Sequence, residues 1–154
     1  MIYIYGMPLY KVLLSMFFSA TLWLILLRVL PKKALYLSSV LILLLSLWGI
    51  ARYCVVFREA PAQHIFIFST TYADLGEEYF REMVMNMLLY FPLGISLSFF
   101  VGPWSILAAF LLSSGVESWQ YLAGTGLAQG TDVIMNTVGA ALGLLPWLIV
   151  NKDR

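Results

Sequence analysis

Charged side chains are scarce in this sequence. They make up 11% of its 154 residues, whereas soluble domains carry about 25%. Hydrophobic residues account for 62% of the chain, and the mean hydropathy is +0.89. So few charges cannot cover a water-facing surface, so we predict an integral membrane protein whose solvent is lipid. The net charge of +1 gives no basis for binding a polyanion, and no nucleic acid is expected as a partner.

Cysteine and histidine are almost absent, and this excludes several kinds of site. Cys54 is the single cysteine and His64 the single histidine, so the chain has neither an internal disulfide nor a Cys/His metal cluster. The nucleophile motif G-x-S-x-G, the zinc-protease motif H-E-x-x-H and a phosphate-binding glycine loop are also missing. We therefore expect no metal site and no cofactor.

Long apolar runs fill most of the chain. A spanning helix needs about 20 mostly apolar residues, and five segments qualify, at residues 9–30, 34–57, 83–101, 103–123 and 132–150. No segment alternates apolar and polar residues, so a β-barrel is not supported. The first run is longer than the apolar part of a signal peptide and is interpreted as an uncleaved helix. The pattern predicts an all-α integral membrane bundle of about five transmembrane helices, forming one domain over residues 1–154.

The connections between these runs are mostly short. Residues 28–33 hold a proline and three basic residues, and Gly102–Pro103 predicts a tight antiparallel hairpin. Glycines interrupt residues 124–130 before the last run. The stretch 58–81 is the long exception, and its apolar patch at 65–68 is too short to span. This patch would lie either in the membrane interface or over the end of the bundle.

Basic residues give a small preference for one orientation in the plasma membrane. With the N-terminus outside, the cytoplasmic basic residues are Arg28, Lys32, Lys33, Lys152 and Arg154, and those on the outer side are Lys11, Arg52, Arg58 and Arg81. The positive-inside rule then favours an outer N-terminus and a cytoplasmic C-terminus. The start of the third helix, the end of the fourth and the start of the fifth would all lie at the outer face.

Three pairs of polar residues lie within or beside the apolar helices, near helix ends. Residues three or four positions apart share one helix face, and the pairs are Glu82 with Asn86, Glu117 with Gln120, and Asp132 with Asn136. Antiparallel helices bring all three faces to the same membrane depth. Ionisable groups at a helix centre cost about 2.5–3.5 kcal/mol on insertion scales. We therefore predict one ligand-binding pocket formed by Arg81, Glu82, Asn86, Glu117, Gln120, Asp132 and Asn136.

These polar residues also have a purely structural interpretation. An arginine such as Arg81, held by carboxylates, suits an anionic ligand. Asp132, however, lies near a helix start, where an acid often serves as a cap or stabilises the helix dipole. Gln120 and Asn136 would also be explained by hydrogen bonds between helices. Both interpretations stay open at this stage.

Glycine and proline mark two further positions. Gly139 and Gly143 form a G-x-x-x-G pattern, which allows two membrane helices to approach closely. Pro92 and Gly94 lie inside the predicted third helix, where a proline removes a backbone hydrogen bond and bends the helix. We expect a close helix contact at the first pair and a kink at the second.

Together these residues resemble the VanZ-like family, membrane proteins named for a teicoplanin-resistance protein. The similarity covers residues 81–145. Residues 86–94 (NMLLYFPLG) are similar to the family pattern N-x-x-x-F-x-P-L-G, and Glu117 to Gln120 match E-x-x-Q. Residues 132–139 (DVIMNTVG), followed by Gly143, are similar to D-x-x-x-N-T-x-G with a further glycine.

The resemblance implies a multispanning bacterial or archaeal envelope protein, linked in some members to tolerance of lipoglycopeptide antibiotics. It implies no reaction. The family often carries an arginine and an acid between its E-x-x-Q and its aspartate, where this chain has Gly126 and Gln129. If the missing arginine binds a ligand elsewhere, Arg81 or Arg52 would have to replace it here.

Three functional hypotheses follow. The first is a non-transporting envelope protein, surrounded by membrane lipids, whose outer pocket binds a lipid-linked or anionic cell-wall ligand. The second is an intramembrane enzyme acting on a lipid or cell-wall precursor, with Glu117 as the candidate catalytic base. The third is a structural scaffold or a carrier; because one chain holds no inverted repeat, a carrier would need a dimer. The sequence leaves the ligand and the oligomeric state open.

Overall fold

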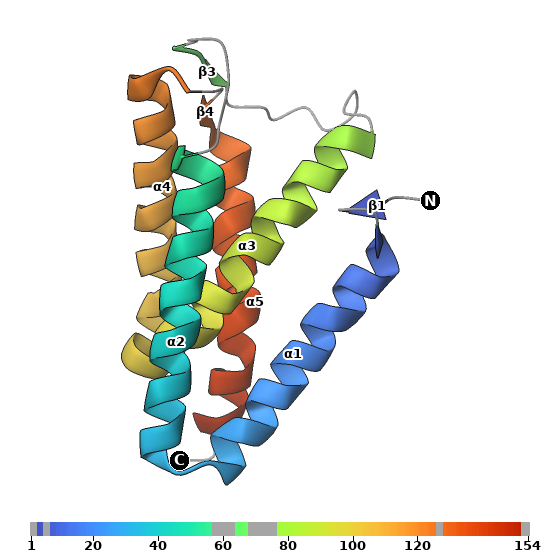
Figure 1. The fold of residues 1–154 in the computed structure, drawn as a ribbon, viewed down its shortest axis with the longest axis vertical. Coiled ribbons are helices and arrows are strands. Elements are labelled where there is room, and N and C mark those ends of the chain that lie inside the picture. Colours follow the sequence, from blue (N-terminus) through green and yellow to red (C-terminus); the bar gives the residue numbers. More distant parts are fainter. Residues whose placement is uncertain (1–2, 5–6, 57–63, 68–76, 126–127, 152–154) are drawn as a thin grey trace.

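Five α-helices make up most of the structure. The computed structural model describes residues 3–4, 7–56, 64–67, 77–125 and 128–151. The helices are α1 (Leu9–Val29), α2 (Lys32–Ile50), α3 (Glu77–Val101), α4 (Ser105–Ala123) and α5 (Gly130–Asn151). Consecutive helices run in opposite directions, so the start of α1 and the end of α5 lie at opposite ends of the bundle (Figure 1).

The helices are apolar enough for a membrane. Three described stretches are long and apolar enough to cross one, namely Lys32–Val55, Phe80–Ala123 and Gly130–Asn151. The second contains both α3 and α4, which fold back on each other, and α1 adds the shorter apolar stretch Leu13–Val29. Many large hydrophobic side chains on these helices are exposed, as lipid contact requires. The prediction of an all-α membrane bundle is confirmed.

Several helix boundaries differ from those predicted. The third helix begins at Glu77 rather than at residue 83, because hydropathy stops at charged residues whereas the helix continues through them. The second predicted helix, 34–57, is divided: α2 ends at Ile50 and a π-helix, η1 (Ala51–Val56), follows it. The wider turns of a π-helix do not change hydropathy, so the sequence pattern gives no sign of it.

The hairpin between α3 and α4 includes a short helix of its own. A 3₁₀ turn, η2 (Gly102–Trp104), precedes α4, which begins at Ser105 rather than at residue 103. Gly102 has a φ of 57° and Gly124, at the end of α4, has a φ of 65°. Both angles lie in the left-handed region that favours glycine, so these two glycines end α3 and α4 where the sequence predicted breaks.

The described residues also include four two-residue strands, which the sequence did not predict. β1 (Tyr3–Ile4) pairs antiparallel with β2 (Met7–Pro8). β3 (Phe66–Ile67) pairs in parallel with β4 (Ala128–Gln129), with Phe66 opposite Ala128. Strands this short show no alternation in sequence. The described part of the patch at 65–68 therefore lies over the end of the bundle, beside the start of α5, and the rest of the stretch up to residue 76 lies outside the described residues apart from His64.

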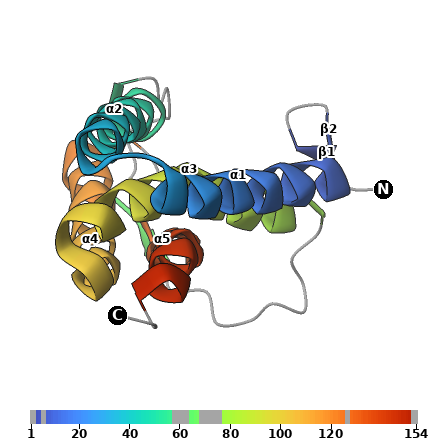
Figure 2. The same ribbon diagram turned by 90° about the horizontal axis from the view of Figure 1, so that it is seen from below.

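Helix α3 is at the centre of the bundle. It crosses the other helices diagonally and packs most extensively against α5, with further contacts to α2, α4 and α1 (Figures 1 and 2). The buried cluster around it joins Tyr90 and Leu93 of α3 to Ile50, Ala109 and Ala140 of the neighbouring helices. The site described below depends on this central position, because α3 touches all four of its partners.

Three glycines bring α3 and α5 into backbone contact. A Cβ built on Gly94 of α3 would lie 2.6 Å from the Cα of Ala140. One on Gly139 would lie 2.8 Å from the Cα of Met87, and one on Gly143 would lie 2.7 Å from the amide nitrogen of Ile95. The close contact predicted for Gly139 and Gly143 is confirmed. Gly94 belongs to the same contact, while the kink expected at Pro92 and Gly94 stays a prediction.

We predict that Gly139→Ala weakens the bundle. The new methyl group meets backbone that cannot move aside, so the free energy of unfolding should fall by about 3 kcal/mol, the upper end of overpacking costs. The measurement is unfolding of the purified protein in detergent, followed by circular dichroism. Gly115→Ala in α4 is the matched control, because a Cβ there meets nothing within 4 Å. An equal loss in both variants would contradict the proposed contact.

Candidate functional site

The predicted polar residues gather at one end of the bundle. The start of α3, the end of α4 and the start of α5 all lie at the end where β3 and β4 pair (Figure 1). Exposed fractions are 6% for Glu117, 1% for Gln120 and 4% for Asn136. Asn86 and Asp132 are half-buried, and Arg81 and Glu82 are exposed. Burial is therefore greatest for Glu117, Gln120 and Asn136, intermediate for Asn86 and Asp132, and least for the two residues nearest the start of α3.

Glu117 joins the end of α4 to the segment that leads into α5. Its Oε2 accepts a hydrogen bond of 2.8 Å from the backbone N–H of Gln129. Gln129 belongs to β4, the last residues before α5 begins at Gly130. A hydrogen bond to a charged acceptor is stronger than one between neutral groups. The carboxylate thus fixes the position at which the chain enters α5.

Gln120 fixes a second segment to α4. Its Nε2 donates a hydrogen bond of 2.9 Å to the carbonyl oxygen of Cys54. Cys54 lies in η1, the π-helix that ends the second apolar run. π-Helical turns are frequent at functional sites. Glu117 and Gln120 share one face of α4, as predicted, but they hold different partners there.

Asn136 of α5 is bonded to a residue that sequence analysis did not include. Its Nδ2 donates a hydrogen bond of 2.8 Å to the Oγ of Ser113, which is buried in α4. Ser113 lies four residues before Glu117, on the same helix face, so its spacing was a usable signal. The interhelical role that stood as an alternative for Gln120 and Asn136 is therefore present in the structure.

Tyr90 of α3 is the second residue that the sequence analysis missed as part of the site. Tyr90 is fully buried. The Ser113 side chain lies near its hydroxyl, but no described residue meets hydrogen-bond geometry with that hydroxyl. The Oδ1 of Asn136 and the Oγ1 of Thr131 are also buried without a hydrogen-bond partner among the described residues. Buried polar atoms are nearly always paired. These three atoms are thus candidates to bind a polar group that enters the site.

Asp132 lies in the first turn of α5, which begins at Gly130. It is therefore inside the helix and is not its cap residue, although its charge still suits the positive end of the helix dipole. His64, at the same end, donates from Nδ1 to the Tyr121 carbonyl oxygen over 2.7 Å. That contact attaches the segment before β3 to the end of α4.

A cavity of about 660 Å³ opens between α4 and α5 beside Glu117. Its lining is mostly apolar and consists of Phe66, Phe110, Ser114, Glu117, Ser118, Tyr121, Leu122, Ala128, Gly130, Val133 and Ile134. Glu117 is the acidic residue in this wall. Several lining side chains, including Phe110, Leu122 and Ile134, are also exposed on the outside of the bundle, so the cavity borders the region that lipid would occupy.

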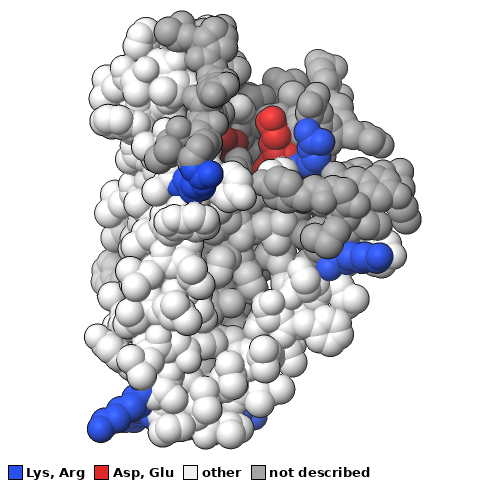
Figure 3. All heavy atoms as spheres, viewed as in Figure 1, with Lys and Arg blue, Asp and Glu red and all other residues white. Residues whose placement is uncertain are grey.

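Charge is also concentrated at this end of the bundle. The acidic residues whose side chains the structure describes are Glu82, Glu117 and Asp132. Figure 3 shows Asp and Glu atoms inside a hollow at this end of the molecule, with Lys and Arg atoms on both sides. Among the described residues, no group of three His, Cys, Asp or Glu side chains is placed to hold a metal ion.

Comparison with known proteins assigns the chain to a family. A sequence profile named VanZ/LLP1 matches residues 35–151. The chain belongs to the VanZ/LLP1 family. The profile begins in α2, ahead of the motif region 81–145, so η1 with its contact to Gln120 lies inside the VanZ/LLP1 region. Sequence analysis found no motif in α2 or η1.

The chain is also similar to a protein of Enterococcus faecium. Protein VanZ of Enterococcus faecium is 36% identical over 77 residues, which cover 47% of this chain and 48% of that protein. The match thus spans about half the length of that relative. No solved structure matches the chain significantly.

We predict a measurable coupling between Asn136 and Ser113. In a double-mutant cycle with Asn136→Ala and Ser113→Ala, unfolding in detergent should give a coupling free energy of about 0.6 kcal/mol and no more than about 1.7, the range for hydrogen bonds between membrane helices. Ser118→Ala is the control, because Ser118 is exposed and bonds its own helix at Ser114. A coupling as small as that between Asn136 and Ser118 would contradict the hydrogen bond.

Proposed function

We propose that this VanZ/LLP1-family membrane protein binds a lipid-linked ligand of the cell envelope at its polar end, without transporting it. The observation that carries the proposal is the cavity between α4 and α5. Its wall combines apolar side chains with one buried carboxylate, Glu117. Ligand pockets are typically apolar with a few well-placed polar groups. An apolar cavity beside lipid suits a ligand that carries a hydrocarbon chain.

The polar head of such a ligand would lie in the charged hollow at the same end of the bundle (Figure 3). Arg81 is exposed near the start of α3 at this end, and an arginine binds phosphate or carboxylate groups through paired hydrogen bonds. Asn136 would accept a hydrogen bond from the ligand through Oδ1, which has no partner among the described residues. Glu117 and Asp132 would position the arginine and the start of α5, and Glu82, Asn86 and Gln120 would complete the polar lining.

The antibiotic link of the family name gives the proposal a biological setting. A protein that binds a lipid-linked cell-wall ligand at the outer face would change how that ligand is presented to teicoplanin. This requires the polar end of the bundle to face outward. The three basic residues of the α1–α2 turn, Arg28, Lys32 and Lys33, lie at the opposite end, and the positive-inside rule would place them in the cytoplasm.

The orientation is tested by cysteine labelling in intact cells. In a Cys54→Ala background, we expect an impermeant maleimide to label Tyr53→Cys and to leave Lys33→Cys unlabelled. Tyr53 is 62% exposed and lies in η1 at the polar end, whereas Lys33 begins α2 at the other end. Both variants should label after the membrane is permeabilised. Labelling of Lys33→Cys alone would invert the orientation and exclude an outer pocket.

The binding site is tested by Glu117→Gln in a teicoplanin-susceptible bacterium that expresses the chain. A glutamine oxygen can still accept from the Gln129 amide, so membrane abundance should be unchanged. Loss of the charge should weaken ligand binding by about tenfold, since a hydrogen bond to a charged group contributes about 1.5–3 kcal/mol. We therefore expect teicoplanin tolerance, measured as the minimum inhibitory concentration, to fall to that of cells without the protein.

Two further variants separate the cavity from the fold. Ser114→Phe narrows the cavity and should also abolish tolerance, whereas Trp119→Phe on the exposed side of α4 should have no effect. Unchanged tolerance in Glu117→Gln and Ser114→Phe at normal abundance would refute the proposal. Turnover of a lipid-linked precursor by the purified protein, lost in Glu117→Gln, would instead support an intramembrane enzyme.

A further inference from the structure

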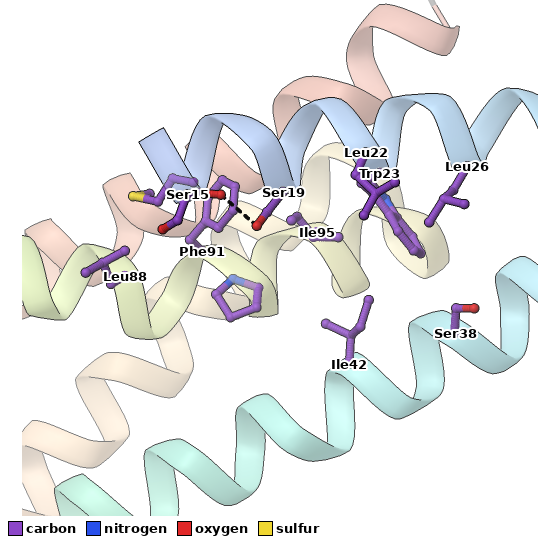
Figure 4. Close-up of a pocket in the computed structure, with 12 residues that line it drawn as sticks. Ser15, Ser19, Leu22, Trp23, Leu26, Ser38, Ile42, Leu88, Phe91 and Ile95 are labelled. Atoms are coloured by element: carbon purple, nitrogen blue, oxygen red, sulfur yellow. Dashed lines mark hydrogen bonds between the residues drawn. The ribbon is translucent and has the colours of Figure 1, made fainter. Parts of the chain in front are cut away.

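A second cavity lies away from the polar end, between α1, α2 and α3. It has a volume of about 450 Å³, and Trp23, Leu26, Ile42 and Phe91 are among its lining residues. Leu30 and Pro31 alone connect α1 to α2, yet the two helices diverge: α1 packs on α5 and α3, whereas α2 packs on α3 (Figure 1). Figure 4 shows side chains from all three helices pointing into the space between them. We call this cavity the α1–α2 groove.

The groove contains an unpaired hydrogen-bond donor. Trp23 is 4% exposed, and its Nε1 has no partner among the described residues. Its ring extends from α1 toward α2 (Figure 4). Ser19, one turn away, is already satisfied by the Ser15 carbonyl oxygen at 2.7 Å. A buried indole N–H usually has an acceptor, so the groove suits a ligand with a hydrogen-bond acceptor.

Depth in the membrane limits the identity of this ligand. Along α1 the groove extends from Leu26 to Ser15, which is roughly 16 Å at the helical rise. Half of the hydrocarbon core of a bilayer is about 15 Å. The groove therefore has the length of one leaflet's acyl chain, and it begins next to Arg28 at the end of α1.

Basic residues at the α1–α2 turn, beyond the Leu26 end of the groove, favour one kind of lipid. Lys32 and Lys33 also line a separate cavity with Tyr36, Leu37 and Phe99. Arg28, Lys32 and Lys33 are exposed at the turn between α1 and α2, and the sequence has no acid between residues 9 and 58. Basic residues at a membrane surface attract anionic headgroups. We propose that the α1–α2 groove binds an anionic phospholipid, with its headgroup at these three residues, one acyl chain in the groove and an ester carbonyl accepting from Trp23 Nε1.

This proposal does not depend on the function assigned to the polar end. The groove is lined by α1, α2 and α3 residues, none of which belongs to the Glu117 cavity. Its Leu26 end also lies near the α1–α2 turn, at the end of the bundle opposite the Glu117 cavity. A phospholipid here would fill the space between two helices that do not pack together, and would attach α1 to the rest of the bundle.

The test uses Trp23 as its own reporter. A variant with Trp23 as its single tryptophan is reconstituted in phosphatidylcholine vesicles with a small fraction of lipid brominated on the acyl chain. Brominated phosphatidylglycerol should quench Trp23 fluorescence at about fivefold lower mole fraction than brominated phosphatidylcholine, because one lysine near an anionic headgroup gives a preference of this size. A variant with Trp104 alone, 70% exposed at the same end, should respond equally to both lipids.

Two variants, one double and one single, show where the lipid binds. Lys32→Gln with Lys33→Gln should remove the preference for phosphatidylglycerol, and Ser38→Phe, which fills the groove, should remove quenching of Trp23 by either lipid. Leu41→Phe on the exposed face of α2 is the control for Ser38→Phe. Equal quenching by both lipids would refute the headgroup contact. Absence of quenching would refute a lipid occupant and indicate that another helix, such as one from a second copy of the chain, fills the groove.

Native mass spectrometry of the unmodified protein gives an independent measurement. We expect one phosphatidylglycerol to stay bound after detergent extraction, and Trp23→Phe to reduce the bound fraction while phosphatidylcholine does not replace it. This measurement does not require the single-tryptophan variants to fold. Retention of no lipid, or of both lipids equally, would overturn the proposal.

Discussion

The contact between the backbones of α3 and α5 is the constraint on which the rest of the structure depends. Gly94, Gly139 and Gly143 leave no room for a side chain at this crossing, so the two helices can meet only at one depth and in one register. In lipid there is little hydrophobic driving force between helices, and close packing has to supply the attraction. That register in turn fixes how far Asn136 of α5 stands from Tyr90 of α3 and from Ser113 of α4.

The same constraint explains why the family patterns contain both glycines and polar residues. In residues 86–94 and 132–139 the glycine follows the asparagine by two turns or by nearly one, so each helix carries its contact point and its polar residue on one short segment. The glycines determine where the two helices cross, and this crossing determines where the polar residues of each helix lie. A change in either would disturb the other, which physically links helix packing to the arrangement of the polar end.

Much of the fold could be predicted from the sequence, because hydropathy reports directly on burial in lipid. Composition and the positions of glycine and proline are enough to predict the all-α class, the order of the apolar runs and the break at Gly102. The early start of α3 could not be predicted, because its first turns are charged and end the apolar run although the helix continues. The π-helix η1 could not be predicted either, because the width of a helical turn leaves no trace in hydropathy. The divergence of α1 from α2 also has no local signal, because it depends on how α1 packs against α5 and how α2 packs against α3.

For the candidate site, helical spacing correctly placed the three polar pairs at one end, but it did not identify their partners. Gln120 donates to a carbonyl oxygen of η1, and Glu117 accepts from the Gln129 amide. Both partners are backbone groups, which every residue carries, so the sequence does not indicate which of them will be bonded. Tyr90 was not identified as a site residue, because an aromatic side chain within an apolar run usually serves only in packing. Whether the seven residues bind a ligand is a separate question from their position, and the hydrogen bonds between helices account for part of their presence.

The order of the helices along the chain has a consequence for biogenesis. Helix α3 enters the membrane before α4 and α5 have been synthesised, yet its glycine face has its closest partner in α5. Until α5 is inserted, that face and Tyr90 stand uncovered, and the polar residues of α3 lack the neighbours that shield them from lipid. Nascent chains interrupted before α5 should therefore be the form that quality-control proteases recognise. The bundle can complete its packing only after α5, the last helix to be synthesised, has entered the membrane and covered α3.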